Sequence, residues 1–230
     1  LEVMAGTMNV GAAANNNHND IEYVSGGAPE VSVSGGTLNV NGQIRRSTNI
    51  ATGNLTYRQS GGDVYIYGKN RDTDQIKRAL LEVLNSGSFN MSGGDLRLAQ
   101  GVASGATTNT FGELYLNPAS SSVTGGTIHT GTSTTGAATG YFNLYLGCPV
   151  WNLTVNGETN AKTAVLKTFS PTINGSLVIG TDGASSATTF NTSSIDVNIG
   201  GDLIIYSSAA SNFIYIYGVK TQKTTFTGYN

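Results

Sequence analysis

Pairs of glycines, each followed by alternating apolar and polar residues, recur along this 230-residue chain. The second glycine of each pair stands at positions 36, 62, 94 and 126, and a partial copy has its glycine at position 6. The intervals are therefore 30, 26, 32 and 32 residues. Internal periods of about 20 to 50 residues are typical of solenoids, propellers and arrays, in which each unit buries its apolar face against its neighbours. The repeat constrains the architecture of the chain far more than its chemistry.

Each copy predicts two strands that meet at the glycine pair. After the glycines, Leu38 and Val40 alternate with Asn39, which is the period-two pattern of a half-buried strand. Before the glycines, the second position upstream is apolar in four copies, as Val3, Val33, Met91 and Val123. We expect the glycines to form a corner that requires a positive φ or a close approach of two backbones.

A third strand is predicted at 81–84 and 113–116, with similar segments at 54–57 and 143–146. Three short strands and three corners in about 30 residues form one coil of a parallel β-helix. Coils stack at about 4.8 Å, so about seven or eight coils give a rod of roughly 35 Å. We therefore expect an all-β fold, a right-handed parallel β-helix (β-solenoid) with coils of about 26–32 residues.

Two other all-β architectures fit the repeat less well. A propeller blade needs about 40 to 50 residues and four antiparallel strands. A sandwich of two antiparallel sheets suits short strands with turn signals, but it gives no reason for the same corner to recur every 30 residues or so.

The form of the corner changes after Trp151. The later corners contain Gly175 and the pair Gly200-Gly201, and the apolar residue before each corner stands one place closer to it. We expect residues 1–230 to form a single solenoid with a change of coil type near 147–160. Because the first residues already match the middle of a repeat, the chain is also expected to be a fragment of a longer one.

Composition excludes several classes of function. Charged residues make up 11% of the chain, against roughly 25% in ordinary soluble domains, and the net charge is −2. A nucleic-acid partner is not expected, because such binding needs clustered Lys and Arg. The single cysteine, Cys148, excludes an internal disulfide and a multi-cysteine zinc site, and we expect it to be a small buried apolar residue. No run approaches the roughly 20 apolar residues of a membrane-spanning helix.

The acidic residues do not form the pattern of a catalytic site. Glycoside hydrolysis needs two carboxylates about 5–10 Å apart across a cleft. Asp63, Asp95 and Asp202 follow the glycine pairs and are interpreted as separate corner residues. Asp72 and Asp74 form a close pair in the charged segment 69–78, which is interpreted as a solvated loop or a ligand-contacting excursion. We expect no catalytic, cofactor-binding or metal-binding residues in this chain.

The histidines and tyrosines are assigned to the surface. His18 lies in an Asn-rich turn and His129 at an outward strand position, so both are expected to be solvated. Outward tyrosines either bind sugars or form stabilising cross-strand ladders, of which the ladder is the favoured interpretation. These tyrosines are Tyr65, Tyr67, Tyr115, Tyr145, Tyr206, Tyr215 and Tyr217.

The repeats resemble those of known surface proteins. The segments 151–157, 173–179 and 199–203, with the closing segment 224–228, resemble repeats of very large secreted surface proteins of Bacteroidota, such as gliding-motility adhesins and other substrates of type IX secretion. The segment 31–42 is similar to autotransporter passenger domains and filamentous haemagglutinin-type adhesins. The resemblance implies a β-helix at the cell surface that serves as a stalk or an adhesive module, and it supplies no catalytic residues.

The sequence therefore predicts a structural or adhesive stalk segment of a large extracellular bacterial surface protein. Its expected partners are flanking repeats of the same polypeptide, with surface polysaccharide or the secretion machinery as further candidates. Two other classes stay open: a β-helical carbohydrate-active enzyme or carbohydrate-binding module, and a phage or ice-binding solenoid. Against ice binding, the threonines at 130, 132, 134 and 135 do not recur from coil to coil.

Overall fold

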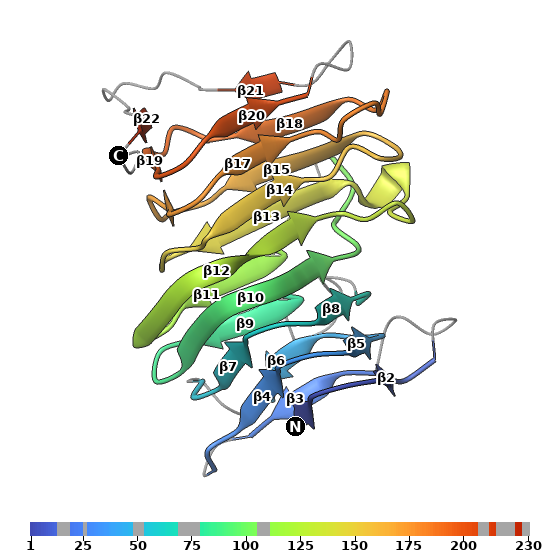
Figure 1. The fold of residues 1–230 in the computed structure, drawn as a ribbon, viewed down its shortest axis with the longest axis vertical. Helices are drawn as coiled ribbons and strands as arrows, with labels where there is room; N and C mark the ends of the chain where they lie inside the picture. Colours follow the sequence, from blue (N-terminus) through green and yellow to red (C-terminus); the bar gives the residue numbers. More distant parts are fainter. Residues whose placement is uncertain are drawn as a thin grey trace.

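The strands of the chain stack into a tall parallel β-helix, with the N-terminal coil at one end and the C-terminal coils at the other (Figure 1). This computed structural model describes residues 1–12, 19–24, 27–47, 53–68, 79–104, 111–206, 212–214 and 224–226. All pairings between named strands in these ranges are parallel. The predicted all-β parallel β-helix is confirmed.

Sheet A contains the strands on both sides of the corners. Strands β10 (Ser88–Leu98) and β12 (Ser120–Thr130) run through a corner and supply both arms. The other strands that precede a corner are β1 (Glu2–Val3), β4 (Glu30–Val33) and β7 (Thr56–Gln59). The other strands that follow a corner are β2 (Thr7–Val10), β5 (Thr37–Val40), β8 (Asp63–Ile66), β14 (Asn152–Val155), β17 (Leu177–Ile179) and β20 (Leu203–Ile205).

Two further sheets complete the coils. Sheet B is formed by β3 (Ile21–Tyr23), β6 (Ile44–Arg46), β9 (Leu81–Leu84), β11 (Leu114–Asn117), β13 (Tyr141–Leu146), β15 (Lys162–Leu166), β18 (Thr188–Asn191) and β21 (Asn212–Ile214). Sheet C is formed by β16 (Thr172–Ile173), β19 (Val197–Ile199) and β22 (Thr224–Phe226). A 3-10 turn, η2 (Ala137–Thr139), precedes β13.

The corner requires glycine for both of the predicted reasons. At the second position, Gly62 has a φ of 67°, and a Cβ added there would lie 2.5 Å from the carbonyl oxygen of Gly36 in the preceding coil. At the first position, a Cβ on Gly61 would lie 2.7 Å from the carbonyl oxygen of Ser34. Side chains at either position would therefore force two coils apart. The corner glycines set the distance between neighbouring coils.

The later corners are built differently. Gly175, Gly200 and Gly201 do not have a positive φ, and the strands that precede them belong to sheet C instead of sheet A. Bonds between side chain and backbone also connect these corners to the preceding coil: the backbone N–H of Ser176 donates to Oδ1 of Asn152 at 2.9 Å. The corner type thus differs on the two sides of β14, while sheets A and B continue past it.

One predicted strand was placed wrongly. The segment 54–57 was predicted as a third strand, but β7 covers Thr56–Gln59 and precedes a corner, paired with β4 and β10. The third strand of the preceding coil is β6 in sheet B, which pairs with β3 and β9. The sequence of β6, Ile-Arg-Arg, contains two arginines that are buried, so hydropathy alone does not reveal it. The predicted third strands at 81–84, 113–116 and 143–146 do lie in sheet B.

The core consists of ladders of equivalent residues, one from each coil. One ladder of sheet A contains Leu38, Val64, Leu96, Ile128, Leu153 and Leu177, each at most 1% exposed. The ladder before the corners includes one polar side chain, Gln59, between Val33 and Met91. Its amide is satisfied internally, because Oε1 accepts from the Tyr57 hydroxyl at 2.8 Å and Nε2 donates to the Asp95 carbonyl at 3.0 Å.

The connections between strands differ greatly in length. Leu38 stands five positions after Val33, and equivalent positions keep this spacing in the other early coils. By contrast, the link from sheet A to sheet B comprises only residues 41–43 between β5 and β6, but residues 99–113 between β10 and β11. The variation in coil length is therefore concentrated outside the corner.

Candidate functional site

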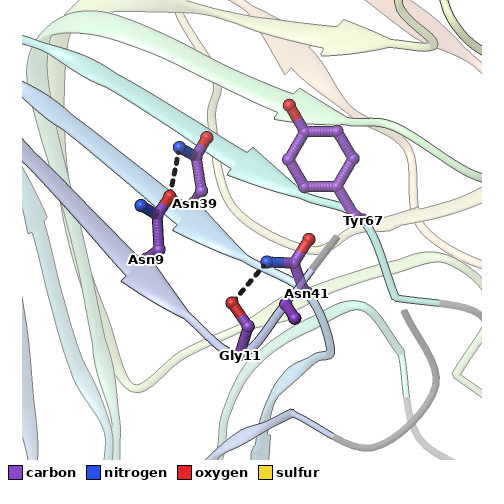
Figure 2. A pocket seen from close by; sticks show the side chains of 6 residues that line it. Asn9, Gly11, Asn39, Asn41 and Tyr67 are labelled. Atoms are coloured by element: carbon purple, nitrogen blue, oxygen red, sulfur yellow. Dashed lines mark hydrogen bonds between the residues drawn. The ribbon is translucent and has the colours of Figure 1, made fainter. Parts of the chain in front are cut away.

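A small hollow lies on the outer face of the first coils (Figure 2). It has a volume of about 340 Å³ and is lined by Asn9, Gly11, Ala12, Asn39, Asn41 and Tyr67. The amide of Asn39 donates through Nδ2 to Oδ1 of Asn9 at 2.8 Å. The amide of Asn41 donates through Nδ2 to the Gly11 carbonyl at 3.0 Å. Both pairs join side chains of one coil to the coil below it.

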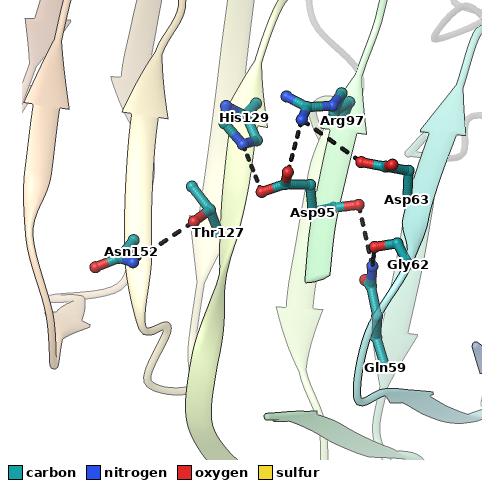
Figure 3. A network of polar contacts seen from close by, with 8 residues as sticks. All are labelled: Gln59, Gly62, Asp63, Asp95, Arg97, Thr127, His129 and Asn152. Atoms are coloured by element: carbon teal, nitrogen blue, oxygen red, sulfur yellow. Dashed lines mark hydrogen bonds and ion pairs between the residues drawn. The ribbon is translucent and has the colours of Figure 1, made fainter. Parts of the chain in front are cut away.

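A network of charged side chains occupies the next coils of the same face (Figure 3). Asp95 is its centre: Oδ2 accepts from Nη2 of Arg97 at 2.6 Å, and Oδ1 lies 2.9 Å from Nε2 of His129. Arg97 also lies 3.5 Å from Oδ1 of Asp63. The network therefore joins three consecutive coils through outward side chains.

This network corrects two interpretations of the sequence. Asp63 and Asp95 are corner residues, as expected, but the structure pairs them in register and gives them a common cation, Arg97. His129 is not a solvated side chain, because only 15% of it is exposed and Asp95 is its partner. Asp202 lies apart, at a later corner where its N–H donates to the Ser176 hydroxyl at 3.1 Å.

The protonation state of His129 follows from its surroundings. Burial lowers the pKa of His129, and the positive charge of Arg97 acts in the same direction, while Asp95 and Asp63 oppose the shift. The imidazole is therefore neutral at pH 7. A carboxylate can only accept a hydrogen bond, so Nε2 of His129 carries the proton and donates to Asp95.

The network is better suited to structure than to catalysis. Both carboxylate oxygens of Asp95 are engaged, one by Arg97 and one by His129. The Arg97 guanidinium also lies over the ring of Tyr65, 5.5 Å from its centroid. These contacts fix one side chain from each of three stacked strands and offset the repulsion between the two neighbouring aspartates. The sequence-predicted candidates Asp72, Asp74 and His18, with the whole segment 69–78, lie outside the described residues.

Sheet B contains a second group of charged side chains, and these are buried. Arg46 pairs with Glu82 through Nε and Oε2 at 3.2 Å, with 6% and 0% of the two side chains exposed. Arg45 pairs with Asp20 at 2.9 Å, with 7% of each exposed. Arg46 also lies 4.9 Å from the centroid of the Phe111 ring. This group cannot be predicted from the sequence, because nothing in a linear pattern distinguishes a paired, buried arginine from a solvated one.

Cys148 is buried, as predicted, with 8% of it exposed. Burial raises the pKa of its thiol to about 12, so the thiolate that would act as a nucleophile is absent at neutral pH.

Tyrosine rings pack against one another on the outer faces of sheets A and B. Tyr115 and Tyr145 are register partners in sheet B, with ring centroids 5.4 Å apart. Tyr65 and Tyr67 stack on the outer face of sheet A, with centroids 5.9 Å apart and planes 8° apart. The predicted cross-strand ladder is confirmed for Tyr115 and Tyr145, whereas Tyr215 and Tyr217 lie outside the described residues.

In the ranges that the structure describes, no cluster of three or more His, Cys, Asp or Glu side chains is arranged to hold a metal ion. In the same part of the chain, no helix has the length and hydrophobicity needed to cross a membrane.

Comparison with known proteins adds no assignment: no protein-family model, curated protein or solved structure matches this chain.

Proposed function

We propose that this chain is a structural and adhesive stalk segment of a large extracellular bacterial surface protein, without catalytic activity. The observation that carries the proposal is the continuous stacking of coils: sheet A runs from β1 to β20 with every neighbouring pair of strands parallel. A solenoid of this kind is quasi-one-dimensional, since each coil contacts only its neighbours, and its length grows with the number of coils. Such an architecture is suited to spanning distance.

The corners also support a mechanical role. The Asp63 N–H donates to the Gly36 carbonyl at 2.9 Å, and the Asp95 N–H donates to the Gly62 carbonyl at 3.0 Å. These bonds join consecutive coils along the axis of the rod, where the glycines allow close approach. Together with the ladders of both sheets, they resist separation of one coil from the next.

The first coil presents a surface suited to a further coil. Met8 is 37% exposed, whereas its ladder partners Leu38 and Val64 are fully buried. Val24 of the same coil is 59% exposed, whereas Ser47, the equivalent residue of the next coil, is buried. Each interior coil covers these two positions of its neighbour, so the shape that fits this surface is another coil of the same kind. We propose a flanking repeat as the partner of this surface.

The extracellular location rests on composition and resemblance. Only 11% of the residues are charged, and uncharged Asn, Ser and Thr fill many outward positions. The repeat style resembles secreted adhesins of Bacteroidota, which is the basis for proposing cell-surface attachment and type IX secretion. The alternative of a carbohydrate-active enzyme is not favoured, because Asp63 and Asp95 share Arg97 as an ion-pair partner and Asp95 is also engaged by His129.

The flanking repeat can be tested by adding one coil. Val3 pairs with Val33 and Val33 pairs with Gln59, so a copy of residues 30–56 placed before Leu1 continues the register. Covering the exposed apolar side chains of the first coil should contribute on the order of 3 kcal/mol. Thermal unfolding should shift upward, and the amides of β2 should become protected from hydrogen exchange.

A shuffled copy of the same 27 residues, counted inclusively from 30 to 56, is the matched control. It has the same composition and length but no register, so it should neither raise the unfolding temperature nor protect β2. If the true copy behaves like the shuffled one, the proposed stacking on the first coil is wrong.

A further inference from the structure

The hollow on the first coils contains polar atoms whose directions are fixed by the protein itself. Asn41 is only 5% exposed, and its Nδ2 is held by the Gly11 carbonyl, so its Oδ1 faces the hollow (Figure 2). Among the described residues, this oxygen has no hydrogen-bond partner. Because this oxygen lies at the surface of the hollow and is not used by the protein, it can accept a hydrogen bond from a ligand there.

The neighbouring amides are oriented in the same way. Because Nδ2 of Asn39 donates to Oδ1 of Asn9, the free atoms of this pair are Oδ1 of Asn39 and Nδ2 of Asn9. The hydroxyl of Tyr67 adds a group that both donates and accepts, since burial and Tyr65 raise the pKa of Tyr67 and keep it protonated. The hollow therefore offers two carbonyl acceptors, one amide donor and one hydroxyl, arranged over three consecutive coils.

This set of groups selects among ligands. A phosphate or sulfate only accepts hydrogen bonds, and it would face two carbonyl oxygens, with no cation among the described residues of the lining. A metal ion or an amine finds no carboxylate among these residues. A ligand with several hydroxyl groups matches the set, because each hydroxyl both donates and accepts.

The tyrosine pair supplies the apolar part of the site. Tyr67 lines the hollow, and its ring stacks on Tyr65, which is held in turn under the Arg97 guanidinium. The flat C–H face of a pyranose ring fits against such an aromatic face, while its hydroxyls reach the amides. A volume of about 340 Å³ is at the lower end of the range for small-molecule sites, which suits one sugar unit.

We propose that the hollow formed by Asn9, Asn39, Asn41 and Tyr67 binds a neutral sugar unit of a polysaccharide. The site gives the rod a defined glycan contact, which goes beyond a role as a spacer. It does not depend on stacking of a further coil, so the two proposals stand or fall by different measurements.

The proposal is tested by NMR titration with cellohexaose, xylohexaose, mannohexaose and maltohexaose, with tri-galacturonic acid and inorganic phosphate as charged comparators. At least one neutral hexaose should shift the side-chain amide signals of Asn9, Asn39 and Asn41 in a saturable way. Loss of one hydrogen bond or of the ring should weaken binding about tenfold, so Asn41→Ala and Tyr67→Ala should each raise the Kd by that factor. The matched control is Tyr206→Ala, which removes a half-buried tyrosine that does not line the hollow.

Asn41→Ala also removes a bond to Gly11 and can loosen the coil, so Tyr67→Phe serves as a second variant that keeps the ring and removes only the hydroxyl. It should weaken binding less than Tyr67→Ala while the unfolding temperature stays that of the parent. The proposal is overturned if no neutral hexaose shifts the three amides, if only the charged comparators do so, or if Tyr67→Ala binds as tightly as Tyr206→Ala.

Discussion

The buried pair of Arg46 and Glu82 should be one of the most sensitive points of the solenoid. Glu82 is fully buried, and its two carboxylate oxygens accept from Nε of Arg46 and from the Ala79 N–H, each at 3.2 Å. Replacing Glu82 by alanine leaves the Arg46 guanidinium buried without this counter-charge and leaves the Ala79 N–H without this acceptor. Both groups would have lost water in folding without regaining an equivalent contact.

The magnitude follows from the geometry. At 3.2 Å and an effective dielectric constant of about 20, the attraction between two unit charges is about 5 kcal/mol. Measured losses from breaking one side of a buried pair are about 3–5 kcal/mol. For a chain of this length, Glu82→Ala should therefore lower the Tm by about 6–20 °C.

Urea unfolding followed by circular dichroism and by the fluorescence of Trp151, the single tryptophan, measures the loss. The matched control is Glu30→Ala, which breaks the pair with Arg58, where 46% and 56% of the side chains are exposed. That pair should contribute less than about 1 kcal/mol. The double variant Arg46→Met/Glu82→Leu should recover most of the stability, because it removes both charges. The reasoning is refuted if Glu82→Ala costs no more than Glu30→Ala.

Three further outcomes are expected. Gly62→Ala should cost about 2 kcal/mol or more, because it forces a positive φ and a clash with Gly36, whereas Gly27→Ala, with open space around it, should be nearly neutral in the same urea experiment. Burial lowers the pKa of His129, so the unfolded chain binds the proton more tightly than the folded chain does. The free energy of unfolding should therefore be highest above the unfolded pKa of about 6.5 and should decline as the pH falls towards the folded pKa. His129→Gln should flatten that decline, and an unchanged pH profile would contradict the assignment. Cys148 should react with a thiol reagent only after unfolding, since burial raises its pKa to about 12; equal rates in folded and unfolded protein would argue against its burial.

The sequence was sufficient to predict the coil but not every strand in it. Repeated glycines and alternating apolar residues specify the corners and the core ladders, because those positions are apolar or glycine in nearly every copy. The strand Ile44–Arg46 escaped prediction because its two arginines are buried by pairing with Asp20 and Glu82, which are distant in sequence. Partners of that kind appear only once the chain is folded.

The network of charged side chains around Asp95 is easier to predict from the sequence than the buried ion pairs of sheet B. Arg97 and His129 each stand three residues after the second glycine of their repeat, and Asp63 and Asp95 each stand one residue after it. Residues at the same offset from the glycine pair become register partners in a stacked helix, so the spacing alone predicts that these side chains lie close together. The hollow at Asn9 and Asn39 obeys the same offset rule, but its depth depends on side-chain orientations that spacing does not give.

The uneven lengths of the connections have a consequence for the evolution of such chains. Corners are intolerant of change because glycine there sets the distance to the next coil, whereas the link from sheet A to sheet B ranges from residues 41–43 in one coil to 99–113 in another without disturbing the register of either sheet. An insertion in that link alters what the coil displays and leaves its neighbours in place. Surface loops can therefore vary while the stacked strands stay unchanged, and duplicated coils can diverge one at a time.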